Sequence, residues 1–217
     1  MLRVEAMRWA CEAGVEKCTS YAEKTYQQWL KNPEMKLDVN LKTEILCAGV
    51  RKASESEWTD TLEYIITSKL DEDDKKDLLM ALACSNSSEI LMTYLNSTLE
   101  PSYPIDFKTG VKNVVSKYPA GAELVSKFLF KENKRIRQIA NFESVIEDVA
   151  SIIGGAVTTQ EQHFELNAFF MERQLMHQLI HATVDATTNM IWIMKYRSTI
   201  DEWLGANSNL FENPDNG

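Results

Sequence analysis

Apolar residues recur along most of this chain at intervals of three and four positions, which places them on one face of an α-helix. Polar turns, Gly and Pro separate the periodic segments, and no two neighbouring segments alternate as a pair of β-strands would. The pattern therefore predicts roughly ten helices joined by short loops. Their expected bounds are 1–13, 15–30, about four short helices within 41–99, 107–117, 119–130, 142–153, 158–171 and 174–204.

Turn and capping residues mark several of the expected helix ends. Gly14 interrupts the first periodic segment, and residues 54–57 (SESE) have the form of a capping box. Residues 158–162 (TTQEQ) supply a second capping signature. We expect Pro119 to be the first residue of a helix, and the two glycines at 154–155 to form a left-handed helix stop.

The short helices follow one another in pairs, which is typical of an α-solenoid. We therefore expect an all-α fold, a stack of antiparallel helix pairs of the HEAT or armadillo kind, although the sequence shows no crisp repeat. Pro101 and Pro104 form the clearest break within the chain. The expected organisation is one helical domain over residues 1–204 and a flexible, polar tail over residues 205–217.

Composition narrows the classes of function. A chain of 217 residues, 44% of them hydrophobic, can bury a core, and its net charge of −9 argues against nucleic acid, which requires a cationic surface. No segment approaches the roughly eighteen consecutive apolar residues of a membrane span, so we expect no direct membrane insertion. Arg3, Glu5 and Arg8 interrupt the first segment, which lacks the apolar run of a signal peptide.

Four cysteines occur, at positions 11, 18, 47 and 84. An even number suits disulfides, whereas buried free thiols would be expected in a cytosolic chain. On one continuous helix Cys11 and Cys18 would lie ~10.5 Å apart along the axis, too far to bond, but a fold-back at Gly14 could join them. A Cys47–Cys84 bond would close a longer loop and contribute about 3–4 kcal/mol. Neither spacing resembles a zinc or redox motif.

Two N-glycosylation sequons follow the last cysteine, with acceptors at Asn86 and Asn96. Such triplets often occur by chance and are modified only in the lumen of the secretory pathway. Together with the candidate disulfides, the sequons favour an extracytoplasmic location, either the extracellular face of the plasma membrane or the secretory lumen.

Residues 177–181 (HQLIH) place two imidazoles at i and i+4 on one helix face, as zinc ligation requires. A zinc peptidase also needs a glutamate general base at the second position, where Gln178 stands, and a neutral amide cannot accept that proton. The remaining histidine, His163, lies on a separate predicted helix. We therefore expect no catalytic residue, cofactor site or metal site in this chain, with an adventitious or structural metal at the two histidines as the alternative.

Several motifs resemble one known family when they are taken in series. They are MRWACEAGVEKC, ILCAGVRKASESEWTDTLEYI, DKKDLLMALACSNSSEILMTYLNSTL, FELNAFF and TTNMIWIMKYRSTIDEWL. These resemble the C-terminal helical domain of aminopeptidase N type zinc metallopeptidases, a group that includes the endoplasmic-reticulum and puromycin-sensitive aminopeptidases. The resemblance covers residues 1–204, strongest over 1–99 and near the end, and weakest over 101–160. Met80 is a departure, because relatives often carry a basic residue there.

The resemblance implies a HEAT-like bowl that caps a catalytic domain and walls off a chamber for peptide substrates. It also implies disulfides matching Cys11–Cys18 and Cys47–Cys84, as in cell-surface members. The family's zinc site lies in an upstream domain, so zinc is expected in that domain and no catalytic residue carries over to this chain. The implied partners are the chain's own upstream catalytic domain, the peptide substrate of the parent protein and a second copy in a homodimer.

Three other interpretations stay open at this point. The chain could be a free-standing α-solenoid adaptor that binds peptides or proteins on its concave face. It could belong to a receptor-like relative that has lost catalysis and keeps the domain for binding. It could also be a cytosolic helical domain with four reduced cysteines and unused sequons.

Overall fold

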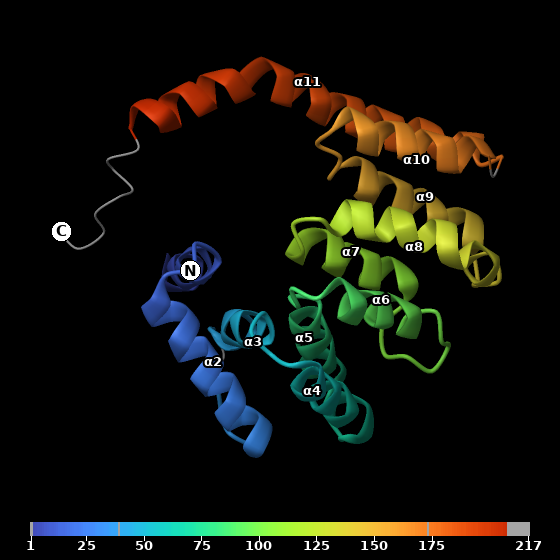
Figure 1. Ribbon diagram of the computed structural model, residues 1–217. Coiled ribbons are helices and arrows are strands. Elements are labelled where there is room, and N and C mark those ends of the chain that lie inside the picture. Colours follow the sequence, from blue (N-terminus) through green and yellow to red (C-terminus); the bar gives the residue numbers. More distant parts are fainter. Residues whose placement is uncertain (1, 39, 173, 208–217) are drawn as a thin grey trace. The chain divides into compact units, whose positions relative to one another are not determined.

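The computed structural model describes residues 2–38, 40–172 and 174–207, without the side chains of Met176, Gln178, Leu179 and His181. These residues form eleven α-helices and no β-strand, which confirms the predicted all-α class (Figure 1). The helices are α1 (Leu2–Glu12), α2 (Glu16–Lys31), α3 (Lys42–Val50), α4 (Glu55–Thr67), α5 (Glu72–Leu82), α6 (Ser88–Ser97), α7 (Phe107–Lys117), α8 (Gly121–Ile136), α9 (Phe142–Gly154), α10 (Gln160–Glu172) and α11 (Met176–Ala206).

The chain divides into two compact units, with the boundary between Val145 and Ile146 inside α9. In the first unit each helix packs mainly on helices one or two places away along the chain, and in the second α10 packs on α11. Contacts between sequence neighbours are the defining property of an α-solenoid. The expected tail, 205–217, falls largely on residues 208–217, which lie outside the described part of the chain.

Both predicted capping boxes are present. The Ser54 hydroxyl accepts a hydrogen bond from the Glu57 backbone N–H at 3.3 Å, and the Glu57 carboxylate accepts one from the Ser54 N–H at 2.8 Å. Thr159 and Gln162 repeat this reciprocal pattern at the start of α10, with distances of 3.2 and 3.3 Å. Because a capping box satisfies N–H groups that the helix leaves free, local sequence is sufficient to determine these two helix starts.

The left-handed stop predicted at Gly154 and Gly155 is wrong. Among the described glycines only Gly14 has a positive φ, of 76°, and it separates α1 from α2 as predicted. Gly154 instead ends α9 at a close helix approach, because a Cβ there would lie 2.5 Å from the backbone oxygen of Ala182 in α11. The glycine is required by packing between two helices rather than by a turn.

Two predictions about α8 also need correction. Pro119 is not the first residue of the helix, because α8 begins at Gly121 after an Ala120 N-cap. The helix also does not end near residue 130, since it continues to Ile136 through a distortion at Glu132, where φ is −101° and ψ is 15°. The extension buries the side chain of Ile136 in the core, which accounts for the longer helix.

Buried aromatic side chains with satisfied polar ends link successive helices of the first unit. Trp58 of α4 donates its indole N–H to the Leu82 carbonyl at the end of α5, at 3.0 Å. The Tyr94 hydroxyl of α6 donates to the Leu79 carbonyl in α5 and accepts from the Asn113 amide in α7, both at 3.0 Å. Burial of its ring raises the pKa of the Tyr94 hydroxyl far above the ordinary value, so Tyr94 remains a neutral donor.

Two disulfides join the same cysteine pairs that the sequence suggests. Cys11 is bonded to Cys18 across the turn between α1 and α2, with the two Cα atoms 5.1 Å apart. Cys47 of α3 is bonded to Cys84, just after α5, with the Cα atoms 5.2 Å apart. No cysteine is free, so the alternative of four buried thiols does not describe this structure.

Replacing the two disulfides separately, as Cys11→Ala/Cys18→Ala and Cys47→Ala/Cys84→Ala, should destabilise the chain unequally. The bonded cysteines are 7 positions apart in the first pair and 37 in the second. In the chain-entropy model the longer loop contributes about 1.5 kcal/mol more, and the second pair should show the larger loss in urea unfolding. Equal losses would mean that loop entropy is not the dominant contribution.

The substitution Gly154→Ala should lower the free energy of unfolding by about 1–3 kcal/mol, because the added methyl group meets the α11 backbone. Gly205→Ala is the matched control, since this residue lies in α11 and an added Cβ would meet no atom within 4 Å. There the greater helix propensity of Ala should be neutral or stabilise by up to ~1 kcal/mol. Thermal unfolding of both variants measures the difference, and a tolerated Gly154→Ala would contradict the close approach.

Candidate docking surface and modification sites

The described residues contain no cluster of three or more His, Cys, Asp or Glu side chains able to hold a metal ion. His177 is exposed, and its Nδ1 lies 3.8 Å from a carboxylate oxygen of Glu147. The side chain of His181 lies outside the described residues, so the histidine pair at 177 and 181 is not described as a unit. His163 is 3.2 Å from the Asn167 amide, which also accepts a hydrogen bond from Thr183.

None of the helices in the described part of the chain combines the length and the apolar content needed to cross a lipid bilayer.

An apolar surface runs along the second half of α11. In the first half of this helix Ala182 and Ala186 are fully buried, and the Asn189 amide donates to the Gly155 carbonyl. These positions are spaced by four and three residues, so they share one helix face. The same spacing of three or four residues continues to Ile193, Tyr196, Ile200 and Leu204. The face that packs within the second unit therefore continues unchanged into the distal half of the helix.

We call five distal residues the α11 stripe: Trp192, Ile193, Tyr196, Ile200 and Leu204. Most of these side chains are exposed, with fractional exposures of 55% for Trp192, 39% for Tyr196 and 42% for Ile200. The Trp192 and Tyr196 rings contact each other with centroids 5.4 Å apart. A hollow of about 210 Å³ beside the stripe is lined in part by Thr158 and Thr159 before α10. Exposed aromatic and aliphatic side chains gathered on one helix face are typical of interaction surfaces, so the α11 stripe is a candidate docking surface.

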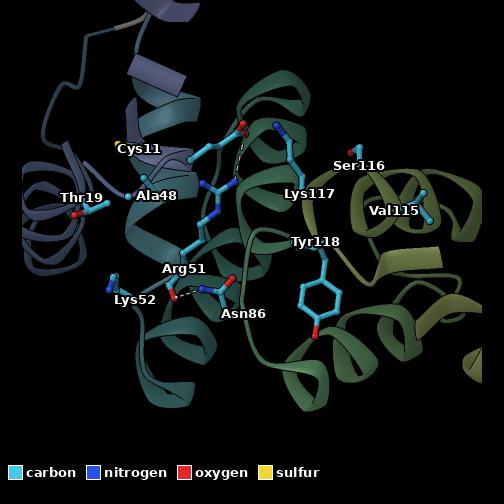
Figure 2. Close-up of a pocket in the computed structure, with 13 residues that line it drawn as sticks. Cys11, Thr19, Ala48, Arg51, Lys52, Asn86, Val115, Ser116, Lys117 and Tyr118 are labelled. Carbon is cyan, nitrogen blue, oxygen red and sulfur yellow. Dashed lines mark hydrogen bonds and ion pairs between the residues drawn. The ribbon is translucent and has the colours of Figure 1, made fainter. Parts of the chain in front are cut away.

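A groove of about 550 Å³ lies in the first unit, where several helix ends meet (Figure 2). Its residues come from the first hairpin, the end of α3, the loop before α6 and the turn between α7 and α8: Cys11, Glu12, Gly14, Thr19, Ala48, Arg51, Lys52, Asn86 and residues 115–119. The Arg51 guanidinium lies 3.5 Å from the Glu12 carboxylate. Lys117 is the last residue of α7, where the helix dipole favours positive charge, and Lys52 lies two residues beyond the end of α3. Both add a cation to the lining of the groove.

The two sequon asparagines occupy different surroundings. Asn86 is exposed in the loop before α6, and its Nδ2 donates to the Arg51 carbonyl at 3.3 Å (Figure 2). Asn96 lies in the last turn of α6, partly buried, and its Oδ1 accepts from the Arg135 guanidinium at 2.9 Å. The hydroxyl of Thr98, the third residue of that sequon, is buried and donates to the Leu95 carbonyl.

Sequence reasoning does not identify either surface. In the sequence the α11 stripe is visible only as a stretch resembling a family motif, although its spacing of four and three residues is readable from residue 182 onward. The groove has no sequence signal beyond the sequon, because its walls come from segments more than a hundred positions apart.

Comparison with known proteins identifies the family of this chain. The family model for the ERAP1-like C-terminal domain matches residues 1–189, including the segment 101–160 where the motifs are weakest. Aminopeptidase Q of Homo sapiens is 28% identical over 202 residues, covering 92% of this chain and 20% of that protein. Aminopeptidase N of Mus musculus is 27% identical over 221 residues, covering 94% of this chain and 22% of that protein.

The chain thus spans about a fifth of the length of these curated relatives. The chain belongs to the ERAP1-like C-terminal domain family, and it is a C-terminal domain of the aminopeptidase N type.

Proposed function

We propose that this chain is the non-catalytic C-terminal domain of an aminopeptidase N-like ectoenzyme, where it caps the catalytic domain and encloses the chamber that holds peptide substrates. The family assignment supports this role. Zinc and its ligands then belong to the upstream catalytic domain. This chain lines part of the substrate chamber and supplies no group that takes part in the reaction. The paired cysteines support an oxidising compartment, such as the cell surface or the secretory lumen.

The observation that carries the proposal is the exposed α11 stripe. Burying one large apolar side chain contributes about 1.5–3 kcal/mol to stability. Several such side chains are exposed together on α11, so the isolated chain does not gain this free energy, and a docked partner would. The stripe is in register with the buried face of the same helix, so a partner would continue the packing that Ala182 and Ala186 begin. The surface is therefore suited to another helical or apolar surface rather than to a charged ligand.

The size of the stripe favours a partner within the same polypeptide. Stable association of separate molecules usually buries about 800 Å² on each side, more than one face of half a helix offers. A domain of the same chain loses much less translational freedom on docking, so a smaller surface is sufficient. We infer that the occupant is the upstream part of the parent enzyme. A second copy of the chain, or a peptide bound by a free-standing solenoid, is the competing occupant.

The substitution Ile200→Asp should distinguish these occupants. In this chain alone Ile200 is 42% exposed, so the change should alter stability by no more than ~0.5 kcal/mol. In the parent enzyme it would place an unpaired charge in an apolar contact, and unfolding should become easier by at least ~2 kcal/mol. Ile66→Asp is the control, because Ile66 on α4 is similarly exposed, at 55%, and lies outside the stripe.

The readout is chemical unfolding together with amide hydrogen exchange of residues 190–206 in both proteins. Protection of these amides in the parent, and its loss in the Ile200→Asp parent, would support docking. Equal behaviour of the two aspartate variants in the parent would remove the stripe from the interface. Concentration-dependent dimers of the isolated chain in sedimentation would instead assign the stripe to a second copy.

The isolated chain should release no amino acid from an aminoacyl-amide substrate, because the reacting groups are assigned to the upstream domain. The parent should release it in a reaction that chelation of zinc abolishes. Turnover by the isolated chain that a chelator removes would place a metal centre within these residues and contradict the proposal.

A further inference from the structure

We propose that Asn86 carries an N-linked glycan whose first sugar lies in the adjoining groove against the ring of Tyr118. The inference rests on the secretory location in the proposed function, because the modification takes place only there. It concerns a different surface from the α11 stripe, so the two proposals fail separately.

The geometry of Asn86 leaves its amide available for modification. The side chain is exposed in a loop, and one N–H of the carboxamide suffices for the 3.3 Å bond to the Arg51 carbonyl. The second N–H is the one that a sugar replaces, so the bond to Arg51 can persist in the modified protein. That bond also fixes the direction of the carboxamide at the wall of the groove (Figure 2).

The groove offers a surface suited to a sugar. Its volume of about 550 Å³ lies within the ~300–1,000 Å³ typical of small-molecule sites. Tyr118 lines it with a half-buried ring that has no aromatic or hydrogen-bonding partner in the described part of the chain. The electron-rich face of such a ring attracts the C–H groups of a pyranose, whose hydrogens carry partial positive charge. Lys52 and Lys117 supply N–H donors for sugar oxygens.

Tethering favours the sugar over a free anion as the occupant of this cationic groove. A glycan linked to Asn86 is held at a high effective concentration beside the groove, whereas a free anion is not. Asn96 offers no comparable binding surface for a sugar. Its carboxamide oxygen accepts a hydrogen bond from the Arg135 guanidinium, which also forms an ion pair with Glu100 at 2.8 Å.

The modification is a group transfer from a polyprenyl-diphosphate-linked oligosaccharide in the lumen. The Asn86 Nδ2 forms a bond to the anomeric carbon while the bond from that carbon to the diphosphate oxygen breaks. The diphosphate leaves with the bonding electron pair, and the amide loses one proton to solvent. No oxidant or reductant takes part.

The test uses the full 217-residue chain carrying Asn96→Gln and secreted from a eukaryotic host, so that Asn86 is the remaining sequon. Mass spectrometry should find one glycan, on Asn86. A peptide N-glycosidase should release it roughly tenfold more slowly from folded than from denatured protein, as expected if the sugar is seated about nine-tenths of the time. Adding Tyr118→Ala should restore rapid release, whereas Tyr118→Phe keeps the ring and should keep release slow.

Thermal unfolding establishes that each variant is folded before its release rate is compared. If Tyr118→Ala does not fold, the ratio of native to denatured release in the Tyr118→Phe protein decides the question. An unmodified Asn86 would overturn the proposal, and so would equal release from folded and denatured protein. Slow release that is unaffected by Tyr118→Ala would overturn the seat on Tyr118. Because these readouts need no peptidase activity, they are independent of whether α11 docks on a catalytic domain.

Discussion

The bond between Cys47 and Cys84 is the constraint on which the first unit depends. It fixes α3 to the segment that follows α5, with both sulfur-bearing residues buried. Two residues past Cys84 lies Asn86, and four residues past Cys47 lies Arg51, so the hydrogen bond between Asn86 and Arg51 is the next contact along the same pair of segments. One covalent link therefore positions the groove wall and the sequon together.

Further along the chain, buried hydrogen bonds hold neighbouring helices together in place of a disulfide. Trp58 holds α4 to the end of α5, and Tyr94 holds α6 to both α5 and α7. Each of these side chains has a large apolar body that is buried and one polar atom that finds a backbone or amide partner. In a stack of short helices each member contacts mainly its neighbours, so such links between neighbouring helices contribute directly to the stability of the stack.

The parts of the fold that depend on local chemistry can be predicted from the sequence. The capping boxes at Ser54 and Thr159 involve side chains three residues apart, so their geometry is decided within one turn. The prediction at Gly154 is wrong because glycine serves two purposes, positive φ and close approach, and only the position of Ala182 shows which one applies. The end of α8 escapes prediction for a similar reason, since the helix continues to Ile136, whose side chain is buried, and burial is a tertiary property that local sequence does not reveal.

The surroundings of the candidate surfaces could not be predicted from the sequence either. Asn86 and Asn96 have equivalent sequons, yet one carboxamide donates to a backbone carbonyl beside a groove and the other holds an arginine. The α11 face is periodic throughout, but periodicity does not reveal where burial stops. Only the structure shows that Ala186 is covered while Ile200 is not.

That partial burial has a physical consequence for docking. An isolated segment as short as the distal half of α11 would be marginally helical in water, because starting a helix is costly. Here the packed first half supplies the nucleus, and each further residue adds a backbone hydrogen bond to an existing helix. The stripe is therefore presented already folded, so a partner would bury Tyr196 and Ile200 without ordering the helix first. The domain can in this way keep its own fold independent of docking while its last helix remains ready to be covered.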